Sequence, residues 1–327
     1  MRPSNRRHSS RRSSAVAAGL ALALAGLVLD PWSGTERAAA GTELTGSRTP
    51  GHTVERPFGK AFNREIPADP AIDTNSGSII DYLAADGLAY ANLYDYGTPI
   101  YYADNATPRV EIECTEPWGP CDLEEAAVPI PQGAEPNTGS DAAMVVVDRD
   151  TGRSIEFWQA TPGATSWSTS WGEIVSVDSK GGYGSTGSGI SRLAGVIRTA
   201  EIEAGSIEHA LVFATDNSCG TFRAPATKSD GASDRTDCIP EGARVQLDPA
   251  VDLSALSMSK AERAVAVALQ RYGAYNIDNA GARMAVMFER PTTGTDPYPA
   301  AGLHWDYYAM EDIPWHQLRV LGEWDGK

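Results

Sequence analysis

The stretch MVVVDRDTGRSIEFWQA, residues 144–160, carries the clearest structural signal of the sequence. Two runs rich in β-branched and aromatic residues, 144–148 and 154–160, lie on either side of a Gly-containing turn at 149–152. Runs of this length around such a turn are typical of a β-hairpin. The sequence therefore predicts that the fold is built on a sheet that contains this hairpin.

Shorter signals on both sides of the hairpin indicate the same fold class. Short helices are predicted at 76–85 and 199–204, and the capping box SKAE at 259–262 opens a longer helix that ends at Gly273. Further strands are predicted at 99–103, 207–214 and 243–247, and a second hairpin from 274–278 and 283–289. Many short strands with few helices predict a mainly β fold, a jelly-roll-type β-sandwich.

The N-terminal segment has the features of a cleavable secretion signal. Five arginines precede an apolar run at 15–29, which is short for a bilayer span, and Ala38-Ala39-Ala40 supplies an A-x-A cleavage site. The pair Arg11-Arg12 also permits twin-arginine export. We therefore expect a signal at 1–40, an extended arm rich in Thr, Gly and Pro at 41–75, and a single β-sandwich domain at 76–327.

The charge balance restricts the partners. Without residues 1–40 the chain keeps 21 basic and 41 acidic residues, a net charge of −20. Such a surface repels polyanions, so nucleic acids and acidic membrane surfaces are poor partners, and membrane insertion is not expected. Neutral substrates, or cations such as calcium, are favoured, and the chain is expected to be a monomer. No cofactor motif is visible, and none of the aspartates that offer oxygen ligands for calcium matches an EF-hand loop.

The cysteine count is even, as expected of an exported protein that forms disulfides. The four cysteines, Cys114, Cys121, Cys219 and Cys238, allow three pairings. We favour the local pairs Cys114–Cys121 and Cys219–Cys238, because each closes a loop rich in turn residues. A zinc site is not predicted, since the spacing and the histidine partners it requires are missing.

Five segments of the chain resemble a group of secreted proteins from high-GC Gram-positive bacteria. They read GSDAAMVVVDRDTGRSIEFWQA, GSGISRLAGVIRTAEIEAGSIEHAL, FRAPATKSDG, IPEGARVQLDP and ALQRYGAYNIDNAG, and they cover most of residues 139–282. The resemblance implies export and a compact β domain. It implies no particular reaction, so the function must be argued from the residues.

The second strand of the first hairpin offers the leading catalytic candidate. Alternation puts Ile155 and Phe157 on one face and Glu156 with Trp158 on the other. An aromatic plate beside a carboxylate suits sugar binding, because the ring stacks on the pyranose and the carboxylate serves as acid, base or nucleophile. Asp148 on the paired strand is the predicted second carboxylate. The alternative is a solvated Glu beside a half-exposed Trp.

Four further residues are candidates with ordinary structural alternatives. His209, on an apolar strand face, is either a proton-transfer residue or a satisfied core histidine. Lys228 and Asp230 lie in the Cys219–Cys238 loop, which would hold them over a sheet, although SDG at 229–231 also reads as a surface turn. Tyr272, near the end of the predicted long helix, is taken as a substrate-binding candidate.

These features together predict a carbohydrate-active secreted protein that binds a polysaccharide or oligosaccharide, with Glu156 and Asp148 as the carboxylates of a glycoside hydrolase. Three alternatives remain open. A polysaccharide lyase would recruit Tyr272, Tyr275 or His209 to remove a proton. A glycan-binding module would need an exposed platform, formed by Trp158, Trp167 and Trp171. A structural envelope protein would need neither an aromatic platform nor a pair of carboxylates.

Overall fold

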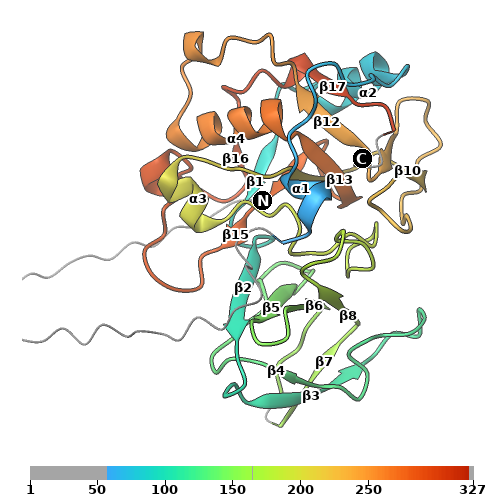
Figure 1. Cartoon of the computed structure of the whole chain (residues 1–327), viewed down its shortest axis with the longest axis vertical. Coiled ribbons are helices and arrows are strands. Elements are labelled where there is room, and N and C mark those ends of the chain that lie inside the picture. Colours follow the sequence, from blue (N-terminus) through green and yellow to red (C-terminus); the bar gives the residue numbers. More distant parts are fainter. Residues whose placement is uncertain (1–56, 164, 324–327) are drawn as a thin grey trace, which may run out of the picture. The chain divides into compact units, whose positions relative to one another are not determined.

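The computed structural model describes residues 57–323 except residue 164. The predicted signal at 1–40 and the first part of the predicted arm, 41–56, lie outside the described residues. Within them the fold is mainly β, as predicted (Figure 1).

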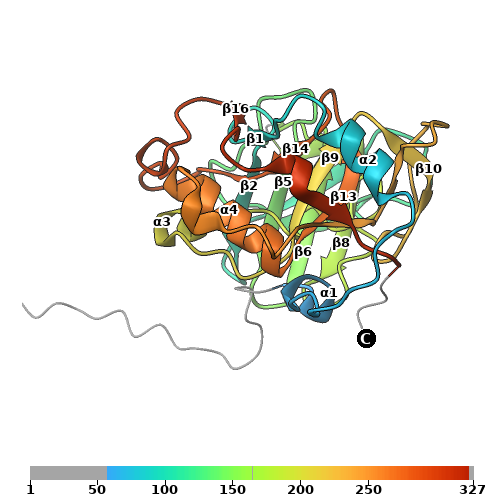
Figure 2. The same ribbon diagram turned by 90° about the horizontal axis from the view of Figure 1, so that it is seen from above.

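The largest sheet has seven strands in mixed orientation. In spatial order they are β16 (Tyr308–Ala309), β1 (Tyr90–Asn92), β14 (Ala285–Met287), β9 (Leu211–Thr215), β13 (Ala274–Asn279), β12 (Arg244–Leu247) and β17 (Leu318–Val320). Helices α2 (Ser76–Leu83) and α4 (Lys260–Arg271) lie over this sheet (Figure 2). The 3₁₀ turns η1 (Leu253–Ala255), η2 (Pro299–Ala301) and η3 (Trp315–Gln317) occur in the loops.

A second sheet has five strands and carries the predicted hairpin. Its order is β15 (Glu289–Arg290), β2 (Thr98–Ala103), β5 (Met144–Asp148), β6 (Arg153–Trp158) and β8 (Trp171–Ser176). Strands β5 and β6 pair antiparallel with Val146 opposite Ile155, so the hairpin prediction is confirmed. Two smaller sheets complete the fold. One holds β4 (Ala127–Pro129), β3 (Arg109–Cys114) and β7 (Ser166–Thr169), and the other β10 (Ser218–Phe222) and β11 (Ile239–Glu241).

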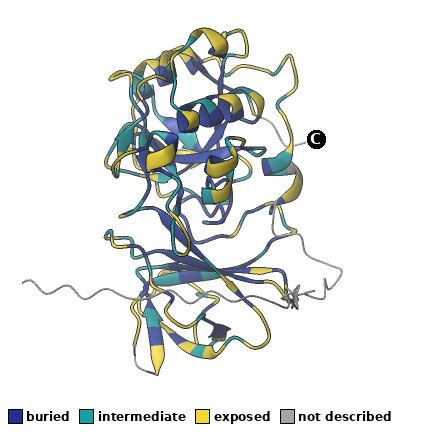
Figure 3. Cartoon of the chain, turned by 90° about the vertical axis from the view of Figure 1, so that its left-hand side faces the viewer, coloured by how far each residue is buried: buried dark blue, intermediate teal, exposed yellow. Residues whose placement is uncertain are grey.

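Three apolar cores separate these layers. Alternation along β9 sends Leu211 and Phe213 toward α2 and α4, and Val212 toward the five-stranded sheet. Along β5, alternation likewise places Val145 in the core between the two large sheets and Val146 in the core that faces the three-stranded sheet. Because these central strands are buried on both faces, their sequences are continuous apolar runs. Buried residues concentrate in the strands of the two large sheets, and exposed ones on the outer turns of the helices (Figure 3).

The predicted helices are confirmed. Ser259 Oγ accepts a hydrogen bond from the Glu262 amide at 3.2 Å, and Glu262 Oε2 accepts one from the Ser259 amide at 3.0 Å, which completes the capping box of α4. Helix α3 (Thr199–Ala204) ends at Gly205, whose φ of 76° is the left-handed conformation that favours glycine.

The second predicted hairpin is wrong. Strands β13 and β14 are not neighbours, because β9 lies between them, parallel to β13 and antiparallel to β14. Other pairs, among them β2 with β5 and β3 with β7, are also parallel. The mainly β class is thus confirmed, whereas the jelly-roll connectivity is not.

The arm prediction is wrong for residues 57–63. Helix α1 (Gly59–Asn63) is flanked by Phe58 and contains Phe62, and both rings are fully buried in the core between the two large sheets. The Phe62 ring centroid lies 5.1 Å from that of Tyr275 on β13. The sequence did not reveal the role of these two rings, because the composition of the segment around them otherwise indicates a loop.

Candidate functional site

Two adjoining cavities form one groove beside the ends of the large sheets. Their volumes are about 720 and 530 Å³. Four residues line both cavities and so mark where they meet: Asp141, Arg192, Asp278 and Asn279. A groove in which polar and charged groups converge is the usual form of a ligand site.

The insertion of β9 positions the central carboxylate. Because β13 and β14 flank β9, the chain after Asn279 must cross the end of β9, and this crossing leaves Asp278 and Asn279 at the groove. Asp278 Oδ2 accepts a hydrogen bond from the Gly187 amide at 3.3 Å, and Asn279 Nδ2 donates to Asp230 Oδ1 at 2.7 Å. A side chain at 187 would collide with Asp230, since a Cβ there would lie 2.4 Å from Oδ1. Strand β13 and the loops at 187 and 230 are therefore closely fitted together.

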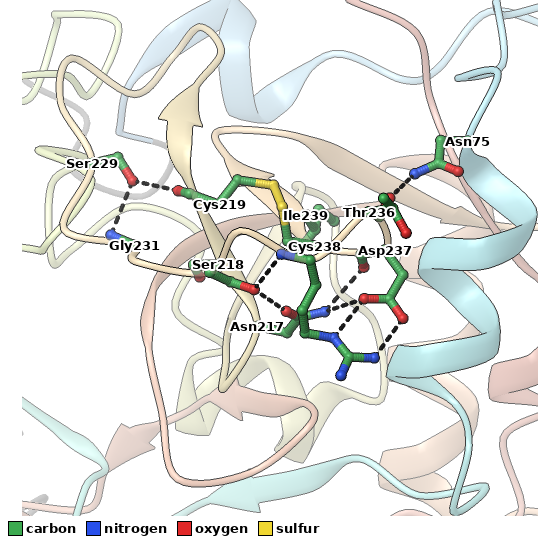
Figure 4. Close-up of a disulfide and its surroundings, with 12 residues drawn as sticks. Asn75, Asn217, Ser218, Cys219, Ser229, Gly231, Thr236, Asp237, Cys238 and Ile239 are labelled. Carbon is green, nitrogen blue, oxygen red and sulfur yellow. Dashed lines mark hydrogen bonds and ion pairs between the residues drawn. A yellow bond between two sulfur atoms is a disulfide. The ribbon is translucent and has the colours of Figure 1, made fainter.

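The Cys219–Cys238 loop brings Lys228 and Asp230 to the groove, where both line the smaller cavity. The Ser229 hydroxyl donates to the Cys219 carbonyl at 2.9 Å and accepts from the Gly231 amide at 3.1 Å (Figure 4). The predicted disulfide thus holds this loop as expected. We call Asp141, Asp230 and Asp278 the carboxylate cluster.

One wall of the smaller cavity is aromatic. Trp158 on β6 and Trp171 on β8 are directly opposite each other in register. Trp118, with 59 % of its surface exposed, lies in the Cys114–Cys121 loop with its ring centroid 5.5 Å from that of Trp158 and 6.4 Å from that of Trp171. Lys228 Nζ lies 5.7 Å from the Trp171 ring centroid. These three rings, the tryptophan wall, offer flat apolar faces next to the carboxylate cluster.

Glu156 does not face the groove. It is fully buried and accepts hydrogen bonds from Ser154 Oγ at 3.0 Å and from the Ser191 hydroxyl. The amides of Ser185 and Arg192 also donate to it, at 3.0 and 2.9 Å. The face predicted to be open is covered by the loop 185–192. Glu156 therefore holds in place the loop that carries Arg192.

Asp148 does not pair with Glu156. In the β5–β6 register Asp148 is opposite Arg153, so it shares the face of Ile155, and Glu156 points to the other face. Its Oδ1 accepts from the amides of Asp150 and Thr151, at 3.1 and 3.2 Å. Asp148 shapes the hairpin turn, and the predicted carboxylate pair is wrong.

The other aromatic and histidine candidates lie away from the groove. His209 contacts Glu201 Oε2 through Nε2 at 3.0 Å and the Ala210 carbonyl through Nδ1 at 2.9 Å. Both ring nitrogens therefore have partners, as expected of a structural histidine. Tyr272 and Tyr275 are buried in the core between the two large sheets. Trp167 packs on Phe157 on the opposite face of the five-stranded sheet from the tryptophan wall.

Three acidic side chains have raised pKa values: Asp278, which lines the groove, and Glu241 and Glu173, which line neither cavity. Burial raises the pKa of Asp278 to about 6; the Arg192 cation opposes this shift, and the negative charges of Asp230 and Asp141 add to it. Burial and the adjacent Asp230 raise the pKa of Glu241 well above its ordinary value. Burial, reinforced by Asp122, raises the pKa of Glu173, whose Oε1 accepts from Trp171 Nε1 at 3.1 Å, to about 7. Perturbed carboxyl groups of this kind are concentrated at functional sites.

Sequence reasoning missed Asp141, Arg192, Asp278 and Trp118. Asp278 and Asn279 carried a visible signal, but the sequence YNIDNAG was interpreted as a hairpin turn. Arg192 and Trp118 stand in irregular segments, where no periodicity indicates which way a side chain points.

Neither a metal site nor a membrane span is found in the described part of the chain. Residues 57–323, without 164, contain no group of three or more His, Cys, Asp or Glu side chains placed to hold a metal ion. Across the same residues, no helix has the length and apolar character needed to cross a bilayer. The chain was also compared with protein-family models, with curated proteins and with solved structures, and none of them matches it.

Proposed function

We propose that this chain is an exported, carbohydrate-active protein, a glycoside hydrolase that cleaves a neutral glycan in the groove. The observation that carries the proposal is the meeting of the tryptophan wall with the carboxylate cluster in one groove. Sugar rings stack on indole faces, and two carboxyl groups beside the bound chain are what glycosidic hydrolysis needs. Export is supported by the signal sequence predicted at 1–40 and by the two disulfides, which are typical of an oxidising compartment.

In this proposal Asp278 is the general acid. Its pKa of about 6 keeps much of it protonated in mildly acidic surroundings, so it donates a proton to the glycosidic oxygen as the bond breaks. Asp141, which lines both cavities, is the second carboxyl group, which stabilises positive charge developing on the sugar or activates the attacking water. Asp230 accepts from Asn279 and so orients the residue next to the acid.

A neutral glycan fits the groove better than a uronate polymer. Three carboxylates line the smaller cavity together with two cations, Arg192 and Lys228. Arg192 is already engaged by Ser185, with Nε 3.3 Å from its hydroxyl. The residues that the lyase alternative would recruit, Tyr272, Tyr275 and His209, line neither cavity. Burial and the neighbouring Asp306 and Asp95 raise the pKa of Tyr307 in the groove.

The test is product analysis with the mature chain, residues 41–327, on a panel of neutral polysaccharides. The variant Asp278→Asn should lower turnover at least ~10²-fold, the scale of a lost general acid. The matched control Asp148→Asn removes a carboxylate of the five-stranded sheet that does not line the groove, and it should retain activity. Binding of a glycan without any product would show a glycan-binding module instead of a hydrolase.

A further inference from the structure

The larger cavity has an aromatic wall of its own, formed by Tyr96 and Tyr307. Their ring centroids lie 6.4 Å apart with the planes inclined by 50°. The tryptophan wall lines the other cavity, and the residues common to both cavities include Asp141 and Asp278. Aromatic surfaces therefore lie on both sides of the proposed catalytic pair.

The Tyr307 side of this wall is fixed by a carboxylate clamp. Asp306 accepts hydrogen bonds from the amides of Leu93, Tyr94 and Asp95, at 3.0, 3.2 and 2.8 Å. Tyr307 itself has φ 55°, a left-handed conformation that a tyrosine adopts only when its surroundings impose it. Such local strain is a common feature of binding sites.

The Tyr96 side is held just as closely. Its hydroxyl lies 2.9 Å from Ser140 Oγ, and a Cβ added to Gly139 would approach the Tyr96 ring to 2.8 Å. Tyr307 reaches the same segment, because its hydroxyl donates to Asp95 Oδ2 at 3.2 Å. Two tyrosines from distant parts of the chain are thus preorganised next to each other, and 39 % of the Tyr307 surface remains exposed.

We propose that Tyr96 and Tyr307 form a second sugar-binding subsite, so that the glycan runs across the carboxylate cluster and is cleaved within the chain instead of at its end. This inference rests on the proposed function and specifies its substrate as a glycan long enough to reach both walls. Each wall binds one side of the scissile bond, and a chain that contacts both is held with that bond at Asp278 and Asp141.

The experiment measures affinity as a function of chain length. The probes are cello-oligosaccharides and N-acetylchito-oligosaccharides of two to eight units, titrated calorimetrically into the mature chain carrying Asp278→Asn, which prevents cleavage. The affinity of one series should rise in two stages, first as the chain covers one wall and again as it reaches the other. Adding Tyr307→Ala should remove the second stage, a loss of about tenfold for long chains, and leave short chains unaffected.

The matched control is Trp305→Ala. Trp305 stands two residues from Tyr307 and is 59 % exposed, but it lines neither cavity, so its removal should leave both stages intact. A single stage of binding, or a Tyr307→Ala effect equal at every length, would overturn this inference alone. Failure of every probe to bind would overturn the proposed function with it. Products released by the unsubstituted chain supply the second readout, since short sugars from the ends only would contradict cleavage within the chain.

Discussion

At the scale of single residues, two acids, the fully buried Glu156 and the partly buried Asp278, differ in what surrounds them. Glu156 accepts four hydrogen bonds from Ser154 and from the loop 185–192. Asp278 receives a backbone hydrogen bond from Gly187 and has other carboxylates nearby. Hydrogen bonds stabilise a buried carboxylate, whereas burial with like charges destabilises it. Glu156 therefore anchors the loop 185–192, and Asp278 is the acid whose pKa is raised.

Replacing Asp278 by Asn should stabilise the protein at alkaline pH. The pKa of Asp278 is raised to about 6 in the folded state from an ordinary value of 3.8, so ionisation favours the unfolded state. Its contribution to folding is largest below pH ~4 and is lost as the pH rises through about 6. At pH 8 the Asn variant should be more stable by about 2 kcal/mol, allowing for partial solvent screening, and the gain should vanish near pH 4. Urea unfolding at both pH values measures this, and an equal stability change at both would contradict it.

Truncating Glu156 should destabilise the fold. The variant Glu156→Ala leaves four donors around a buried site without their acceptor, which we expect to cost about 3 kcal/mol in the free energy of unfolding. Glu203→Ala, an exposed position on α3, is the control and should change stability by less than about 0.5 kcal/mol. Chemical denaturation at pH 7 compares the two variants. Equal stabilities would mean that water replaces the carboxylate without loss.

At the scale of elements, the Cys219–Cys238 loop links stability to the site. The double variant Cys219→Ser/Cys238→Ser frees a loop of 19 residues, and the chain-entropy argument gives a loss of about 3 kcal/mol. Because Ser229 bonds the Cys219 carbonyl, glycan affinity should fall as well. Thermal unfolding and calorimetric titration test both effects. Opening Cys114–Cys121 in the same way should instead weaken stacking through Trp118, and unchanged binding in both variants would contradict this link.

Local elements were predictable from sequence, and long-range pairings were not. The β5–β6 hairpin and the capping box of α4 depend on residues a few positions apart, so their patterns are visible in the sequence. The pairing of β13 with β9 joins segments about 60 residues apart, and nothing local distinguishes it from a hairpin with β14. Lys228 and Asp230 could be found because the cysteines that close their loop are visible in the sequence. Glu156 was misplaced, because alternation gives its face but cannot show that a loop covers that face.

At the scale of the whole molecule, the N-terminal segment contributes to stability. A chain that begins at Ser76 lacks Phe58 and Phe62, both fully buried. Since losing one buried Phe costs about 3–5 kcal/mol, and a domain is stable by about 5–15 kcal/mol, this truncation should leave little or no folded protein. A chain that begins at Pro57 keeps both rings and serves as the control. Circular dichroism during heating measures the outcome, and equal melting temperatures would contradict the burial of these rings.

The position of β9 between β13 and β14 also constrains how the chain folds. Strand β9 is synthesised some 60 residues before β13 and β14, so it stays without either neighbour until both of these strands have been made. Sheets whose neighbours are distant in sequence form slowly, and their unpaired edges stay open to other chains meanwhile. The same crossing that brings Asp278 to the groove therefore makes the refolding yield of this protein sensitive to its concentration.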